Sequence, residues 1–154
     1  MLEIVVNIFN MIAIVLVIVI WVYTFRKYKF LPQQIPTHFD LEQKPDAFGS
    51  KKFAFFLPVL SVVMVAVLIF AGEFSGGNYP VKITKENFNA QFSIMRVLMS
   101  WLSIVLAFIF FNIQDYMLRL SLDAQVKPRV HLFLPLVFIF ISVVTAIIFA
   151  YIYK

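Results

Sequence analysis

Apolar residues run in long stretches along this chain, and four of these stretches are long enough to cross a lipid bilayer. They cover residues 4–25, 53–71, 97–113 and 132–153. At 1.5 Å per residue, a helix of about 20 residues covers the ~30 Å of hydrocarbon in a bilayer. The pattern therefore predicts an all-α integral membrane protein, with four transmembrane helices in a single domain over residues 1–154.

Capping residues and prolines indicate where these helices start. Ser50 precedes the second span as an N-cap, and Pro58 lies within the first two turns, where missing backbone hydrogen bonds are easily replaced. Pro135 has the equivalent place in the fourth span. The helical pattern of the third span begins earlier, after Thr84, which predicts a long third helix. The first span lacks the basic start and small-residue cleavage site of a signal peptide, so we expect it to be retained.

The third helix carries a stripe of polar residues at spacings of three and four, which places them on one face. This polar stripe consists of Asn89, Ser93, Arg96, Ser100 and Ser103. Small residues let helices approach closely in lipid, and serine or asparagine can hydrogen-bond across the contact. We therefore expect the stripe to pack against other helices or to line a cavity. The guanidinium of Arg96 must snorkel to the interface, pair with an acid or face water.

Composition and charge narrow the class of protein. The chain is 62% hydrophobic and 14% charged, which excludes a soluble globule because too little polar surface is left to cover it. The absence of cysteine excludes disulfides, a cysteine zinc site and a thiol nucleophile. The net charge of +5 is typical of basic loops in a membrane protein, and no nucleic-acid partner is expected.

Four spans place both termini and the connection 72–91 on one side of the membrane. The connections 26–52 and 114–131, with His38 and His131, then share the other side. Most lysines and arginines also belong to that second side. The positive-inside rule therefore places it in the cytoplasm.

The connection 26–52 is the most informative segment outside the spans. It is too long for a bare turn between helices, and long ordered connections are usually functional. Pro32, Pro36 and Pro45 stiffen its path, and Gly49 supplies turn chemistry just before the Ser50 cap. We expect a long, proline-rich structured loop that caps one end of the helix bundle.

Two blocks of residues carry a resemblance to a known family. The first reads Leu31-Pro32-x-x-Ile35-Pro36-x-His38-Phe39, then Pro45-Asp46-x-x-Gly49-Ser50-Lys51, and the second reads Asn78-Tyr79-Pro80-Val81-Lys82-Ile83-Thr84. The arrangement resembles a bacterial membrane family of unknown function, a domain that also forms the N-terminal part of SdpI-type bacteriocin immunity proteins. The resemblance implies a multi-pass protein of the bacterial cytoplasmic membrane.

The chain also departs from that family. Gln43 stands where relatives commonly have glycine, and Ala47 and Phe48 stand where many have glycine and tryptophan. The additional C-terminal membrane segment of SdpI-type proteins does not follow the fourth span. Relatives usually begin with a basic N-terminus, which implies a loop outside the cell and opposes the charge count, so both orientations stay open.

The expected function is non-catalytic binding, sensing or immunity through the loop 31–51. The expected binding residues are Pro32, Pro36, His38, Phe39, Pro45, Asp46, Gly49, Ser50 and Lys51. The expected partners are the lipid bilayer, a peptide toxin or another membrane protein, and a second copy of the chain. The alternative is an accessory or structural subunit of a larger membrane complex, such as a transporter, that packs through the polar stripe.

Enzymatic and metal-dependent functions are not expected. The sequence has no H-x-x-x-H or H-E-x-x-H spacing. The residues that could bind a metal are His38, Asp40, Asp46 and His131, with Asp123 a weaker candidate, and the two histidines come from different loops. A histidine held by a backbone group or a carboxylate is therefore expected at position 38 instead of a metal ligand. The acidic residues form no opposed pair for acid–base chemistry, so no catalytic residue, metal or cofactor is predicted.

Overall fold

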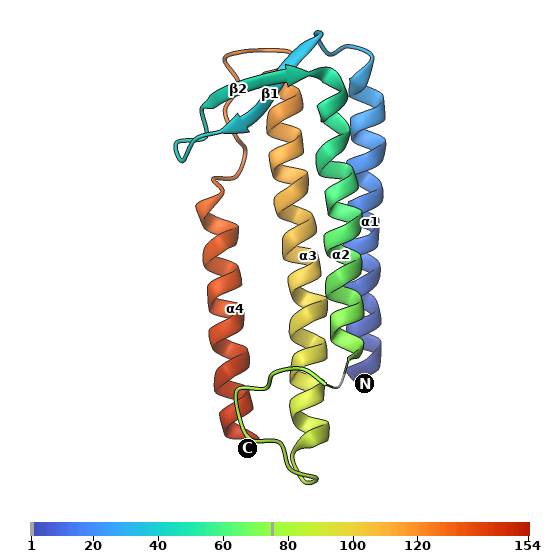
Figure 1. The fold of residues 1–154 in the computed structure, drawn as a ribbon, viewed down its shortest axis with the longest axis vertical. Helices are drawn as coiled ribbons and strands as arrows, with labels where there is room; N and C mark the ends of the chain where they lie inside the picture. Colours follow the sequence, from blue (N-terminus) through green and yellow to red (C-terminus); the bar gives the residue numbers. More distant parts are fainter. Residues whose placement is uncertain (1, 75) are drawn as a thin grey trace.

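The computed structural model describes residues 2–74 and 76–154, which form four long helices and a small two-stranded sheet (Figure 1). The helices are α1 (Leu2–Tyr28), α2 (Phe56–Glu73), α3 (Phe88–Leu120) and α4 (Phe133–Ile152), and a 3-10 turn, η1 (Lys51–Phe55), leads into α2. All four are long and apolar enough to cross a membrane, which indicates a multi-pass membrane protein. The predicted fold class is confirmed, and α3 extends well beyond the predicted span 97–113 at both ends.

Helix α3 is the centre of the bundle, and it packs against α1, α2 and α4. Three residues of α1, Val6, Ala13 and Ile20, recur every seven positions and are fully or almost fully buried. Ala13, Val65 of α2 and Ala107 of α3 form one buried cluster. Their small side chains let the three backbones approach closely, as expected where helices associate in lipid.

The start of α3 shows why the third helix is long. Thr84 and Asn87 exchange hydrogen bonds, because each side chain accepts from the other residue's backbone N–H, at 3.3 and 2.8 Å. This reciprocal pair has the geometry of a capping box. The helix itself begins at Phe88, with Asn87 as the residue before it. The predicted early start is therefore confirmed. A turn over residues 84–87 precedes the first helical residue, Phe88.

Helix α4 stands beside α3 and is mostly uncovered (Figure 1). Only Pro135 and Ala150 are buried among its residues. Hydrogen bonds at three levels hold it to α3: from Asn112 to the Val130 carbonyl (2.7 Å), from Trp101 to Ser142 (2.8 Å) and from Gln91 to the Ala150 carbonyl (2.9 Å). The fourth helix thus buries few residues, and these polar contacts, one of them to Val130 just before the helix, link it to α3.

The expected proline-rich loop is wrong in form, because residues 34–50 make an antiparallel hairpin of β1 (Gln34–Phe39) and β2 (Pro45–Ser50). The hairpin lies across the end of the bundle opposite the two termini (Figure 1). The prolines do not prevent pairing, since Pro45 is the first residue of its strand and a two-stranded sheet has two edges. The register shifts on both sides of His38, so the strand pairing is irregular at this residue.

Gly72 lies at a close contact between α2 and α3. A Cβ at this position would lie 3.3 Å from the Met99 Cβ and 3.8 Å from the Arg96 Cα. Glycine therefore fits a contact that has little room for a side chain.

We expect Gly72→Leu to lower the free energy of unfolding by about 2 kcal/mol, because the added side chain pushes α2 away from α3. The neighbouring Ala71 is exposed, so Ala71→Leu is the matched control and leaves stability almost unchanged. Unfolding in mixed micelles by SDS titration measures both. Equal effects of the two substitutions would contradict the close helix contact.

Candidate functional site

The hairpin is held to the bundle by a small hydrophobic core. Ile35 is fully buried, and it clusters with Leu31 before β1, Ala54 in η1, and Met117 and Leu118 at the end of α3. The Tyr116 hydroxyl adds a 3.0 Å hydrogen bond to the Gln43 carbonyl at the hairpin turn. One side of the hairpin is thereby fixed, and its shape is set before any partner arrives.

The turn of the hairpin is tight and internally bonded. The Lys44 N–H donates to a carboxylate oxygen of Asp40 at 2.8 Å, and the Gln43 N–H donates to the Asp40 carbonyl at 2.9 Å. Gln43 has a φ of 63°, in the left-handed region that favours glycine. Two residues earlier, Leu41 is 99% exposed at the tip.

His38 and Asp46 form a pair on the exposed part of the hairpin. The His38 Nδ1 lies 2.6 Å from an Asp46 carboxylate oxygen, with 68% and 48% of the two side chains exposed. The expectation that a carboxylate or a backbone group holds this histidine is confirmed. His131 is not part of this pair. Its Nδ1 accepts a hydrogen bond from the Phe133 N–H at the start of α4.

A hollow of about 240 Å³ lies between the hairpin, α3 and the segment before α4. Its polar lining comes from residues of the hairpin and α3: Thr37, His38, Asp40, Gln43, Asn112 and Tyr116. The buried amide Nε2 of Gln43 has no hydrogen-bond partner among the described residues. The hollow therefore offers a carboxylate and an imidazole to a polar group that enters it, and the buried Gln43 amide belongs to a residue of its wall.

Apart from Phe39, the other residues predicted for binding do not line the hollow, and several of them shape the hairpin. Gly49 faces Thr37, because a Cβ there would lie 2.9 Å from the Thr37 Cγ2. The Ser50 hydroxyl accepts from the Lys52 N–H at 3.4 Å, as expected of a cap, and the Lys51 ammonium lies over the Tyr28 ring. Pro36 is buried and Pro32 is exposed, while Phe39 lines the hollow and Pro45 begins β2.

The residues of the polar stripe on α3 have different surroundings along the helix. Ser100 and Ser103 are buried inside the chain, and the Ser103 hydroxyl bonds to the Ser100 carbonyl. Ser93 lines an apolar hollow beside α4, and Asn89 is exposed near the start of the helix.

Arg96 is paired with acids instead of snorkelling or lining a cavity. One guanidinium nitrogen lies 2.8 Å from Glu3 of α1, and another lies 2.9 Å from Glu73 of α2. The arginine side chain is 13% exposed, whereas both glutamates are largely exposed. The pairing ties three helices together at the end of the bundle that carries the termini. The sequence alone gave no partner, because the three residues lie far apart along the chain.

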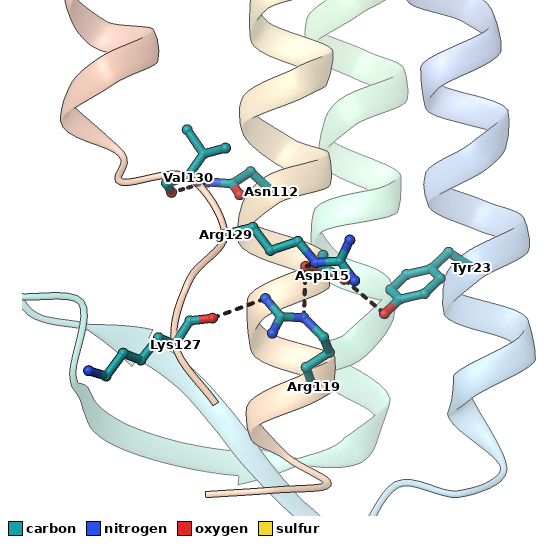
Figure 2. A network of polar contacts seen from close by, with 7 residues as sticks. All are labelled: Tyr23, Asn112, Asp115, Arg119, Lys127, Arg129 and Val130. Carbon is teal, nitrogen blue, oxygen red and sulfur yellow. Dashed lines mark hydrogen bonds and ion pairs between the residues drawn. The ribbon is translucent and has the colours of Figure 1, made fainter. Parts of the chain in front are cut away.

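A charged cluster that sequence reasoning missed lies at the hairpin end of the bundle (Figure 2). The Asp115 carboxylate is 5% exposed and lies 2.8 Å from the Arg119 Nε and 3.2 Å from the Arg129 Nε. The Tyr23 hydroxyl donates to the same carboxylate at 2.9 Å from α1. The i, i+4 spacing of Asp115 and Arg119 within α3 is the one sequence signal that pointed here.

Gln114, next to this cluster, joins three elements. Its Nε2 donates to the Thr24 hydroxyl of α1 and to the Ala54 carbonyl of η1, both at 2.8 Å. The side chain is fully buried. It therefore fixes the base of the hairpin relative to α1 and α3.

The acidic residues and histidines do not gather at one place. Within residues 2–74 and 76–154, no three histidine, aspartate or glutamate side chains converge as metal ligands. The most enclosed carboxylate, Asp115, is already paired with two arginines.

Known proteins are similar to part of this chain. The family described as "Domain of unknown function (DUF1648)" matches residues 15–62, which cover the second half of α1, the hairpin, η1 and the start of α2. An uncharacterized protein of Archaeoglobus fulgidus is 37% identical over 60 residues, which are 39% of this chain and 31% of that protein. The chain thus matches less than a third of that relative's length. No solved structure matches.

Proposed function

We propose that the protein is a non-catalytic binding protein of the bacterial cytoplasmic membrane, immunity-like or sensory, that captures a peptide segment at the hairpin. The observation that carries the proposal is the hollow beside Gln43, whose buried amide donor lacks a partner among the described residues. A buried donor without an acceptor costs about 1–3 kcal/mol, and a peptide carbonyl that reaches this amide would recover that energy.

The surroundings of the hollow suit a peptide. His38 and Asp40 supply polar contacts at its rim, and Phe39 supplies an apolar wall. Leu41 and Phe48 are exposed apolar side chains on the same hairpin, at 99% and 61%. Because the hairpin is fixed by its own core, little ordering energy is lost when a peptide binds.

Photo-crosslinking in cells tests the proposal. A benzophenone amino acid at Phe48 should give a discrete adduct with a peptide, whereas the same probe at Phe70, which is 66% exposed on α2, should react only with lipid. Replacing His38 and Asp46 together by alanine should lower the adduct yield about tenfold, because losing a charge-assisted hydrogen bond weakens binding by roughly that factor. This exposed pair contributes little to folding, so expression should be unchanged.

Two results would contradict this function. One is the same adducts at Phe48 and Phe70, and the other is a Phe48 adduct with full yield after both alanine substitutions. A discrete protein adduct from a probe on the outer surface of α4, such as at Phe140, would favour an accessory subunit that packs through α4 instead of the polar stripe, whose Ser100 and Ser103 are buried inside the chain.

The side of the membrane from which the peptide arrives can be measured on the same chain. Because the sequence has no cysteine, Leu41→Cys and Asn78→Cys each introduce a single thiol at an exposed position, one at each end of the bundle. A membrane-impermeant maleimide on intact cells labels only the outer one. Labelling at position 41 supports capture of an extracellular peptide, and labelling at position 78 requires a cytoplasmic partner.

A further inference from the structure

An apolar groove of about 350 Å³ runs between α1, α3 and α4, below the Asp115 cluster. Its lining includes Leu16 of α1, Val105 and Phe108 of α3, and Leu134 and Phe138 of α4. Trp101 lines its far end and also lines a second hollow of about 550 Å³ between the same helices. The loose attachment of α4 leaves this groove open toward the lipid.

One end of the groove lies toward the Asp115 cluster. Tyr23 follows Leu16 by seven residues on α1, and Asp115 follows Phe108 by seven residues on α3. Seven residues are about two turns, so each pair shares a face and is separated by ~10 Å along the helix. Arg129 directly precedes Val130, which lines the groove. The cluster therefore lies where a molecule lying in the groove would reach the membrane surface.

Positive charge exceeds negative charge in this cluster. Arg119 and Arg129 both contact Asp115, and the Lys27 ammonium lies 6.0 Å from the centre of the Tyr23 ring. Two arginines thus share one carboxylate, and a third cation lies over the tyrosine that donates to it. Arg129 is 70% exposed and contacts Asp115 through its Nε, so its two terminal nitrogens are left for an anion (Figure 2).

The depth of the cluster matches a lipid headgroup. Arg96 and Arg119 lie 23 residues apart on α3, which corresponds to ~35 Å and places both near the boundaries of the ~30 Å hydrocarbon layer. One leaflet supplies about half of that thickness. A lipid tail that starts beside Asp115 therefore extends past Phe108 inside the groove.

We propose that this groove is a binding site for one anionic phospholipid, with its phosphate on Arg129 and Arg119 and one acyl chain along Phe108 between α1, α3 and α4. Charge complementarity selects the headgroup, and the apolar lining takes the chain. This site is separate from the hollow under the hairpin. The lipid covers the side of α3 that α4 leaves bare and packs α4 indirectly against α1.

The stability of the unchanged chain in detergent tests headgroup selection. Dioleoyl phosphatidylglycerol should raise the unfolding midpoint more than the same mole fraction of dioleoyl phosphatidylcholine, because a ligand that binds the folded chain stabilises it. Arg129→Gln should weaken the preference about fivefold. Arg26→Gln removes an exposed charge from the same end of the bundle and should leave the preference intact. Equal shifts with both lipids, or equal loss in both variants, would overturn the site.

Fluorescence quenching tests where the acyl chain lies. Phe108→Trp in a chain with Trp21 and Trp101 replaced by Phe has one reporter, since the chain has two tryptophans. Phosphatidylglycerol brominated halfway along its chains should quench Trp emission more than equally brominated phosphatidylcholine. Equal quenching would show ordinary bulk lipid. No quenching by either would show that protein, such as a second copy of the chain, covers the groove. Both results contradict the proposal.

Discussion

Replacing Asp115 by alanine should lower the free energy of unfolding by about 3 kcal/mol. The substitution removes the shared partner of Tyr23, Arg119 and Arg129, and removing one member of a buried ion pair leaves the other charge uncompensated. Arg119 is only 20% exposed and bears most of this penalty, whereas Arg129 is 70% exposed and can be hydrated. SDS titration of the purified chain, followed by far-UV circular dichroism, measures the change.

The control for this prediction is Glu42→Ala at the hairpin tip. Glu42 and Lys44 form an ion pair in which both side chains are 72% exposed, and such surface pairs contribute little. We expect a change within about 0.5 kcal/mol. If Asp115→Ala were as mild as Glu42→Ala, the cluster would not fasten α1 and the segment before α4 to α3.

Gln114→Ala should also lower the free energy of unfolding by about 3 kcal/mol. The Ala54 carbonyl would lose its donor, which costs about 1–3 kcal/mol for a buried group, and the fully buried side chain would leave a cavity. The loss should be largest at the hairpin, because Gln114 joins η1 to α1 and α3. Hydrogen exchange of the hairpin amides, measured together with global unfolding, separates the two effects.

Gln125→Ala is the matched control, since Gln125 is an exposed glutamine in the connection after α3. It should leave both stability and hairpin exchange unchanged. A Gln114→Ala chain that unfolds normally and retains slow hairpin exchange would show that the hydrophobic core around Ile35 alone holds the hairpin. In that case the hydrogen bonds of Gln114 would not contribute to holding the hairpin in place.

The hairpin illustrates what sequence patterns miss. Its strands have only six residues each and contain three of the features that argue against strands: two prolines, a glycine and an irregular register. The pattern nevertheless indicated an ordered cap, because Pro36 and Pro45 restrict the chain and Ser50 begins a helix. The pairing depends on burial of Ile35 against α3, a contact that local propensity does not encode.

The candidate site was predicted in part for the same reason. His38 and Asp46 were expected from the loop pattern, and the structure brings them together across the hairpin. Gln43 was noted as a position where relatives commonly have glycine, which agrees with its left-handed backbone. Its unpartnered amide and the surrounding hollow became visible only once α3 and the segment before α4 were packed beside the turn.

The sequence by itself determined the four membrane helices and the two ends of the bundle. Long apolar stretches leave a chain no alternative in lipid, because every backbone polar group must be bonded within its own segment. Only the tertiary structure decided the partners of the charged and polar residues. Tyr23 meets Asp115 across 92 positions and Arg96 meets Glu3 across 93, and such contacts depend on which helix faces turn toward each other. Hydropathy fixes how many helices cross the membrane, and side-chain packing between the helices fixes which polar and charged residues meet.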